Sequence, residues 1–255
     1  ETAPRITARE DEDVTSCISG FLEKEGIRIV AGQAVTRVER AGDGIAVHVG
    51  GERIEGSHVL VATGRLPNTE KLNLAAVGVQ TDQRSYVPTN GRLETNVPGI
   101  WALGDINKRG AFTHTSYHDH EIVLANHDGG TRSADGRTMC YAMFTDPPLA
   151  RVGASEAEAR ASGKRVLMAK FDMKNVSRAK EESETTGLVK LVVDADTDRF
   201  LGATMVGLNA DEIIHVFTNF IAAGGTARVM KETLPVHPTV AEFMPTILGQ
   251  LKPLQ

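Results

Sequence analysis

Two short apolar runs, each followed by a glycine, constrain the fold of this chain more than any other feature. Val59–Ala62 leads through a threonine into Gly64, and Ile100–Leu103 leads into Gly104 and Asp105. Such runs are typical of strands buried on both faces of a parallel sheet. Ligands bind beyond the carboxyl ends of these strands, where glycine lets the backbone approach and a carboxylate accepts hydrogen bonds from sugar hydroxyls. The runs predict an α/β fold with a ligand-binding edge, although a lone Gly-Asp pair is more often a plain turn.

The first half of the chain also predicts a helix, a β-meander and a second helix. Residues 10–25 are amphipathic and start with acidic residues, so a helix is expected there, with Cys17 packed beside its apolar face. Glycine-bearing turns then separate short β-type segments. The expected strands are 27–30, 34–40, 45–49 and 53–55. A helix is expected over 113–126, followed by a polar, glycine-rich linker at 128–136.

Beyond the linker, the pattern changes to that of an α+β domain. Ser155 and Glu158 form a capping-box pattern that opens a helix ending near Gly163. Strands are predicted at 140–144, 165–172, 187–194 and 200–206, and helices at 212–223, 226–233 and 239–250. Strands followed by amphipathic helices favour an antiparallel sheet with helices packed on it.

Composition excludes several classes of partner and site. The chain has 28 basic and 33 acidic residues and no basic block, so neither nucleic acid nor an anionic membrane is an expected partner. No apolar run is long enough to span a bilayer. The only cysteines, Cys17 and Cys140, lie far apart, and this low usage is consistent with a cytoplasmic protein. His114 and His118 have helical spacing but no further ligand beside them, so no metal site is predicted.

The segment from Val236 to Glu242 is the third candidate functional motif. His237 precedes Pro238, and this type of peptide bond permits the cis form. Thr239 and Glu242 have the spacing of a helix cap. Alternatively, Glu242 orients the imidazole of His237 and makes it an acid/base near neutral pH. The spacing alone favours the cap and leaves the dyad open.

Taken together and in this order, these motifs resemble the second half of the flavin-dependent pyridine nucleotide–disulfide oxidoreductases, in particular their dihydrolipoamide dehydrogenase-like and mercuric reductase-like members. The resembling segments are Ala-Thr-Gly-Arg-Leu-Pro-Asn from Ala62, Gly-Ile-Trp-Ala-Leu-Gly-Asp from Gly99, Asp-Pro-Pro-Leu-Ala-Arg-Val-Gly from Asp146, and His-Pro-Thr-Val-Ala-Glu from His237. The resemblance implies remnants of FAD- and NAD(P)-binding α/β domains followed by an α+β interface domain. The implied parts are 1–60 of the NAD(P) domain, 61–133 as the central FAD segment, and 138–255 as the dimerisation domain.

The resemblance also assigns roles to single residues. Asp105 corresponds to the carboxylate that binds the FAD ribityl chain, and Gly64 and Gly104 lie in the matching flavin segments. Thr113 and His114 begin the helix that points at the flavin ring, where the helix dipole stabilises negative charge.

For the interface domain, the resemblance implies a catalytic histidine and a homodimer. His237, oriented by Glu242, corresponds to the acid/base that serves the thiol pair of the partner subunit, and its bond to Pro238 is expected to be cis. The homodimer is expected to form through residues 138–255.

Three family features are absent from the sequence: the GxGxxG turn for FAD, the CxxxxC redox pair and the GxGxxG turn for NAD(P)H. The chain is therefore predicted to be part of an enzyme that passes electrons from NAD(P)H through FAD to a cysteine pair. The cysteine pair would then pass the electrons to a disulfide, a metal ion or a related small-molecule or small-protein acceptor. Mercury is less favoured, because the chain has a histidine motif and no terminal cysteine pair. The alternative is a non-catalytic dimerisation module with a partial flavin-binding surface.

Overall fold

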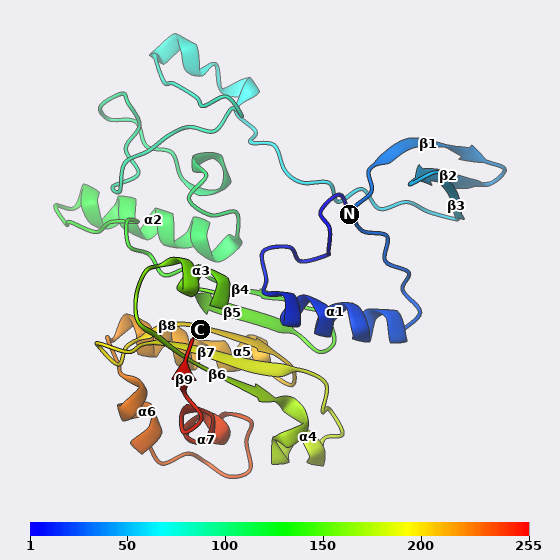
Figure 1. The fold of residues 1–255 in the computed structure, drawn as a ribbon. Coiled ribbons are helices and arrows are strands. Elements are labelled where there is room, and N and C mark those ends of the chain that lie inside the picture. Colours follow the sequence, from blue (N-terminus) through cyan, green and yellow to red (C-terminus); the bar gives the residue numbers. More distant parts are fainter. Residues whose placement is uncertain (255) are drawn as a thin grey trace. The chain divides into compact units, whose positions relative to one another are not determined.

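A computed structural model describes residues 1–254 of the chain (Figure 1). The chain divides into two compact units. One combines residues 1–59 with the chain from Thr138 onward, and the other is Leu60–Arg137. The division into three family domains expected from the sequence remains a prediction. Within the described residues, no helix is both long enough and apolar enough to cross a lipid bilayer.

The larger unit contains a six-stranded antiparallel sheet with the strand order β4-β5-β8-β7-β6-β9. Its strands are β4 (Cys140–Met143), β5 (Leu149–Gly153), β6 (Val166–Asp172), β7 (Leu188–Asp194), β8 (Phe200–Val206) and β9 (Lys252–Pro253). The helices of this unit are α1 (Glu12–Lys24), α3 (Glu156–Ala161), α4 (Ser177–Glu181), α5 (Ala210–Ala222), α6 (Ala227–Glu232) and α7 (Met244–Leu248). Two 3-10 helices, η4 (Met173–Asn175) and η5 (Ala241–Phe243), join them. The antiparallel α+β prediction is confirmed.

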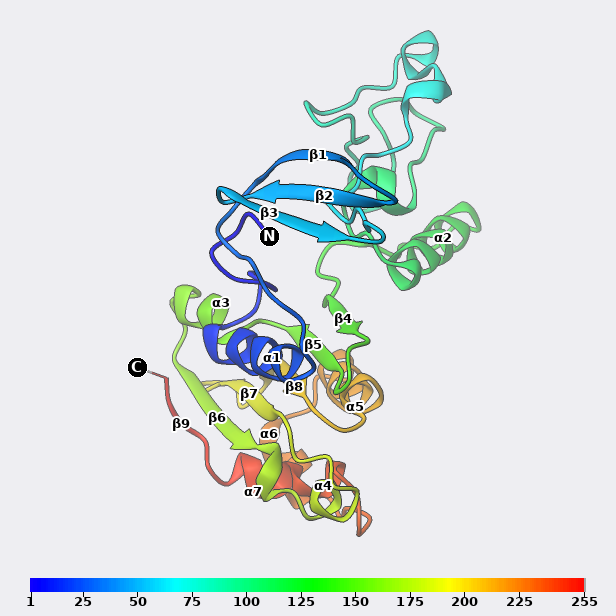
Figure 2. The same ribbon diagram turned by 90° about the vertical axis from the view of Figure 1, so that its right-hand side faces the viewer.

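Alternation along the strands places different helices on the two faces of this sheet. Leu149, Leu188 and Val206 pack against α1, whereas their neighbours along the strands pack in a larger cluster with Ile214 and Phe217 of α5. Figures 1 and 2 show α1 on one side of the sheet and α6 and α7 on the other. Strand β7 is buried along its whole length because it is covered on both faces.

Local sequence signals explain several helix boundaries in this unit. Ser155 Oγ accepts a hydrogen bond from the Glu158 amide at 3.2 Å, and the Glu158 carboxylate accepts one from the Ser155 amide at 2.8 Å, so the predicted capping box is confirmed. The single helix predicted over 239–250 is wrong, because η5 and α7 form two shorter helices there. Pro245 lies in the first turn of α7, where a residue without an amide N–H is tolerated.

The predicted β-meander is present as β1 (Val35–Ala41), β2 (Gly44–Val49) and β3 (Glu52–Gly56), paired antiparallel in this order. Val38, Val47 and Ile54 lie opposite one another across the three strands. The prediction of a strand at 27–30 is wrong, because the segment has no strand partner within the described residues.

The unit Leu60–Arg137 has little regular structure. Its elements are η1 (Glu70–Leu72), η2 (Leu74–Val77), η3 (Gly104–Asn107) and α2 (Thr113–His127). Two small apolar clusters hold it together: Val79, Val87 and Ala102 form one, and Leu93, Ile122 and Ala134 form the other.

The two buried parallel strands predicted in and next to this unit are wrong. Leu60 and Val61 are 90% and 73% exposed, and the segment 100–103 makes only an isolated antiparallel bridge between Trp101 and Glu94. An apolar run becomes a buried strand only where other strands pair with it and helices cover it. Residues 60–137, all of them described, contain no strand that provides this pairing.

Candidate functional site

The imidazole of His237 and the carboxylate of Glu242 form a hydrogen-bonded pair. Nδ1 of His237 lies 2.8 Å from Oε2 of Glu242, and the bond from His237 to Pro238 is cis, as expected. The Glu242 side chain is only 12% exposed, whereas the His237 side chain is 74% exposed. A largely buried carboxylate therefore orients a largely exposed imidazole ring.

The structure places the N-cap of η5 at Val240, one residue after the predicted Thr239, but Thr239 still makes the hydrogen bond expected of a cap. Thr239 Oγ accepts a hydrogen bond from the amide of Glu242 at 3.1 Å and donates one to the carbonyl of Val236 at 2.8 Å. The two interpretations are compatible, because Thr239 fixes the backbone of Glu242 while the Glu242 carboxylate turns to the imidazole.

Beside this pair lies an apolar hollow of about 340 Å³. Glu242 is the one charged residue in its wall, and the other lining residues include Val216, Phe220, Met230, Val236 and Met244. Apolar walls around the Glu242 carboxylate strengthen its attraction for a proton donor such as the imidazole.

Asp105 belongs to the 3-10 helix η3 and not to the end of a buried strand, so that part of the prediction is corrected. Leu103 is extended, and Gly104 turns the chain with a φ of +72°. The Asp105 carboxylate is exposed and accepts a hydrogen bond from Nη1 of Arg65 at 2.8 Å. Asp105, Arg65, Pro67 and Tyr86 are among the residues that line a hollow of about 340 Å³. Asp105 thus faces a recess, as the sequence predicted, but from a tight turn.

Glycine is required at position 104 for two reasons. Its φ lies in the left-handed region, and a Cβ there would come within 2.9 Å of Ser116 Oγ on α2. Gly64 also has a positive φ, of +121°, but its surroundings are open, because a Cβ there would meet no atom within 4 Å.

The start of α2 presents Thr113 and His114 to solvent. The Phe112 amide donates a hydrogen bond to Thr115 Oγ at 3.1 Å, and the rings of Phe112 and His114 stack with centroids 5.1 Å apart. α2 has 15 residues, so its N-terminus carries the partial positive charge of a full helix dipole.

Sequence reasoning missed Asp119, Asn107 and Arg137. Asp119 is 1% exposed, and its Oδ2 accepts hydrogen bonds from the Gly104 amide at 2.9 Å and from Nδ2 of Asn107 at 2.7 Å. Arg137 donates to Oδ1 of Asp119. The available signal was the position of Asp119 on the face of α2 that also carries the buried Thr115 and Ile122.

A second charged cluster lies in the larger unit and surrounds Lys190, which is 1% exposed. The Lys190 ammonium group lies 2.9 Å from Asp11, 3.0 Å from Asp13 and 2.5 Å from Glu156. Burial disfavours the charged form of Lys190, but the hydrogen bonds to the three carboxylates outweigh it and raise its pKa.

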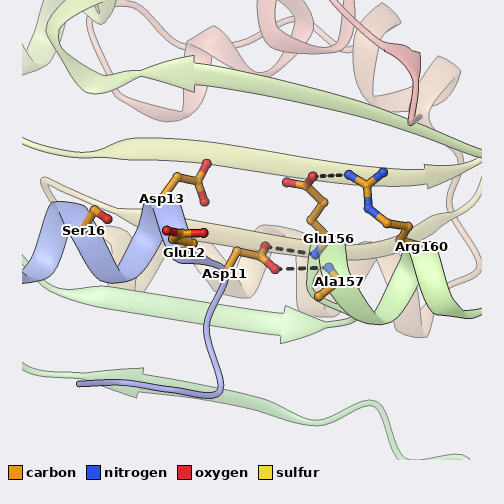
Figure 3. A pocket seen from close by; sticks show the side chains of 7 residues that line it. All are labelled: Asp11, Glu12, Asp13, Ser16, Glu156, Ala157 and Arg160. Atoms are coloured by element: carbon orange, nitrogen blue, oxygen red, sulfur yellow. Dashed lines mark hydrogen bonds and ion pairs between the residues drawn. The ribbon is translucent and has the colours of Figure 1, made fainter. Parts of the chain in front are cut away.

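These carboxylates line a hollow of about 430 Å³ in Figure 3, where Asp11 accepts hydrogen bonds from the amides of Glu156 and Ala157. The cluster joins the segment before α1 to α3 and β7. Cys17 of α1 is half-buried, and burial raises the pKa of its thiol, consistent with the packing role expected from the sequence.

Comparison with known proteins identifies the family. Residues 1–120 match the pyridine nucleotide-disulphide oxidoreductase family, and residues 139–247 match the dimerisation domain of the same family. The chain belongs to the pyridine nucleotide-disulphide oxidoreductases. The recognition made from the four sequence motifs is confirmed, as is the fold class.

Three relatives place this chain within the family. It is 30% identical to the probable pyridine nucleotide-disulfide oxidoreductase RclA of Escherichia coli, over 99% of this chain and 58% of RclA. It is 34% identical to dihydrolipoyl dehydrogenase of Thermus scotoductus (95% and 54% covered) and 33% identical to mercuric reductase of Staphylococcus aureus (95% and 45% covered).

A solved structure supports the same placement. The structure of RclA from Escherichia coli, described as an HOCl-induced flavoprotein disulfide reductase, superimposes with a TM-score of 0.92 at 30% identity and covers 98% of this chain and 58% of RclA. The chain spans about half the length of the curated relatives it matches.

The residues around Asp105 fit a hydroxyl-bearing ligand such as the ribityl chain of a flavin. The recess offers an exposed carboxylate as acceptor and the guanidinium of Arg65 as donor. The close approach of Gly104 to α2 keeps the turn next to the helix that begins at Thr113.

Proposed function

We propose that this chain is part of an FAD-dependent oxidoreductase that passes electrons from NAD(P)H through the flavin to a redox-active cysteine pair and then to a disulfide, a metal ion or a related acceptor. The proposal is carried by the His237–Glu242 pair, which presents an oriented and exposed imidazole on the family's dimerisation domain. Cys17 and Cys140 are far apart in the sequence, so the cysteine pair is not part of these 255 residues.

When bound, FAD would supply the two-electron chemistry, and this chain would hold and polarise it. Asp105 would accept hydrogen bonds from the ribityl hydroxyls, with Gly104 and Gly64 in the adjoining segments. The N-terminus of α2, at Thr113 and His114, would stabilise negative charge on the flavin ring. The exposed carboxylate of Asp105 and the exposed start of α2 support the proposed roles of Asp105 and the helix.

His237 would move the proton of the thiol chemistry. With Nδ1 of the imidazole bonded to Glu242, the other ring nitrogen is left to accept a proton from a thiol or to return it. The thiol pair would belong to the partner subunit of a homodimer formed through residues 138–255, of which 139–247 match the dimerisation domain. A small-molecule or small-protein disulfide is the first acceptor to test, because RclA is described as a disulfide reductase.

The test is the substitution His237→Ala in the flavoprotein that contains this chain. Thiol-dependent turnover should fall by roughly 10²- to 10⁴-fold, the usual contribution of a positioned acid/base. Flavin content and direct electron transfer from flavin to a quinone should be unchanged, because that route bypasses the thiols. His127→Ala, at the exposed C-terminal end of α2, is the matched control and should leave both activities intact.

Equal losses in the thiol and quinone assays would show that His237 is structural and that capping is the whole role of the motif. A purified protein without visible flavin absorption would instead favour the non-catalytic dimerisation module.

A further inference from the structure

We propose that Asp119 is the positioning residue of the flavin-binding turn: its buried carboxylate holds both ends of η3 and thereby fixes the direction of Asp105. This inference rests on the proposed function, because it assumes that Asp105 binds the flavin. Asp119 does not contact the ligand and acts only through the turn.

The hydrogen bonds of Asp119 bracket Asp105. One bond comes from the amide of Gly104, directly before Asp105, at 2.9 Å, and the other comes from the side chain of Asn107, two residues after it, at 2.7 Å. Both reach the same oxygen, Oδ2. The two ends of the turn are therefore tied to one atom of α2.

The turn needs this support because it is too short to be stable alone. η3 has four residues, and short 3-10 helices have poor hydrogen-bond geometry. The side chain of Asn107 connects the turn to its surroundings in two further ways. Nδ2 also donates to the carbonyl of Ala102 at 3.1 Å, and Oδ1 accepts from the amide of Arg109 at 2.9 Å. The side-chain hydrogen bonds of Asp119 and Asn107 thus hold the turn in place of the backbone hydrogen bonds that neighbouring strands would make.

Charge explains why a carboxylate occupies this position. Arg137 is 10% exposed at its side chain and donates to Oδ1 of Asp119, so the buried negative charge is neutralised within the same unit. Hydrogen bonds to a charged acceptor are about twice as strong as those to a neutral one. Oδ2 thus remains a strong acceptor for the turn while Oδ1 is held by the arginine.

The first experiment needs no flavin. Amide hydrogen exchange over residues 103–108 is measured in the flavin-free protein for the wild type and for Asp119→Asn. Exchange should become at least tenfold faster in the variant, because the charge that holds the Gly104 amide is lost. Asp128→Asn, an exposed aspartate at the C-terminal end of α2, is the matched control and should leave the exchange unchanged.

The second experiment measures the flavin dissociation constant in a double-mutant cycle. Asp119→Asn and Asp105→Asn should each weaken binding by roughly ten- to a hundredfold, the range for hydrogen bonds to charged groups. The double variant should bind no more weakly than Asp105→Asn alone, because Asp119 acts through Asp105. If Asp119 only stabilised the fold, the losses of flavin affinity in the two single variants would add up in the double variant.

The outcomes separate this inference from the proposed function. Unchanged exchange in Asp119→Asn, or additive losses in the cycle, would overturn the positioning role. Unchanged flavin binding in Asp105→Asn would overturn the role of Asp105 in the proposed function, and the exchange result would still decide whether Asp119 holds the turn. Should Asp119→Asn fail to fold, Asn107→Ala removes one of the two bonds and leaves the pair of Asp119 and Arg137 intact. It should speed exchange in the same segment.

Discussion

The six-stranded sheet and the segment Leu60–Arg137 satisfy their backbone polar groups by different means. In the sheet, the strands pair with one another around a continuous apolar core that contains Leu191, Met205 and Phe217, each fully buried. In Leu60–Arg137, side chains do much of this work: Asn90 accepts from the amides of Arg92 and Glu94, and Asp119 accepts from Gly104. Backbone pairing between strands stabilises the sheet along its whole length. Side-chain hydrogen bonds instead allow an irregular turn to hold the carboxylate of Asp105 at the surface.

The largest expected difference concerns core truncation. Phe217→Ala should lower the free energy of unfolding of the larger unit by about 3–5 kcal/mol, because the close-packed core cannot fill the space. Leu93→Ala should cost Leu60–Arg137 about 2 kcal/mol, the low end for such a change, because its cluster is small and partly exposed. Ile122 and Ala134 are the other buried members, and Leu103 and Val123 are only partly buried.

The two units can be followed separately during urea unfolding. The single tryptophan, Trp101, lies in Leu60–Arg137, so its fluorescence reports that unit, while circular dichroism reports mainly the sheet and its helices. Phe144→Ala, at an 83% exposed site, is the control and should change stability by less than about 0.5 kcal/mol. Equal costs for Phe217→Ala and Leu93→Ala would contradict the contrast between the units.

Lys190→Met tests the charged cluster of the larger unit, which is the exception to the apolar packing of its sheet. The substitution should cost about 3 kcal/mol, at the low end for breaking a buried ion pair, because Asp11, Asp13 and Glu156 lose their shared cation. Circular dichroism during urea unfolding measures the change. Lys252→Met, on the exposed strand β9, provides the matched comparison. A cost as small as that of Lys252→Met would mean that α1 is held by its apolar face alone.

The smallest expected effect is the acid sensitivity that Asp194 gives to the larger unit. The hydrogen bond from Lys164, together with two backbone amides, lowers the pKa of Asp194 to about 2 from its usual 3.8. Because the folded value is the lower one, the stabilisation is complete above about pH 4 and is lost as the pH falls toward 2. Lys164→Met should therefore reduce the stability lost between pH 5 and pH 2.5. Lys180→Met, exposed on α4, should behave like the wild type in the same urea titrations.

The sequence predicted most of the larger unit because its signals are local. The largely apolar runs of β7 and β8, the capping box at Ser155 and the amphipathic pattern of 10–25 depend on residues close in the chain. The strands expected at 59–62 and 100–103 failed, because an apolar run does not reveal whether strands are available to pair with it.

The candidate site was predictable to the extent that motifs carry it. The pair of His237 and Glu242 was found because six adjacent residues contain it. Asp119 was missed because its partners lie 15 and 12 residues away and no spacing rule connects them.

The pairing of Lys190 with Asp11 has a consequence for synthesis of the chain on the ribosome. The two residues are 179 positions apart, and all of Leu60–Arg137 is translated between them. At a translation rate of roughly 5–20 residues per second, Lys190 and the sheet face that α1 covers are synthesised on the order of ten to thirty seconds after α1. During that interval Val14, Ile18 and Phe21 have no native surface to pack on. The nascent segment therefore leaves this apolar face uncovered until the sheet has been translated.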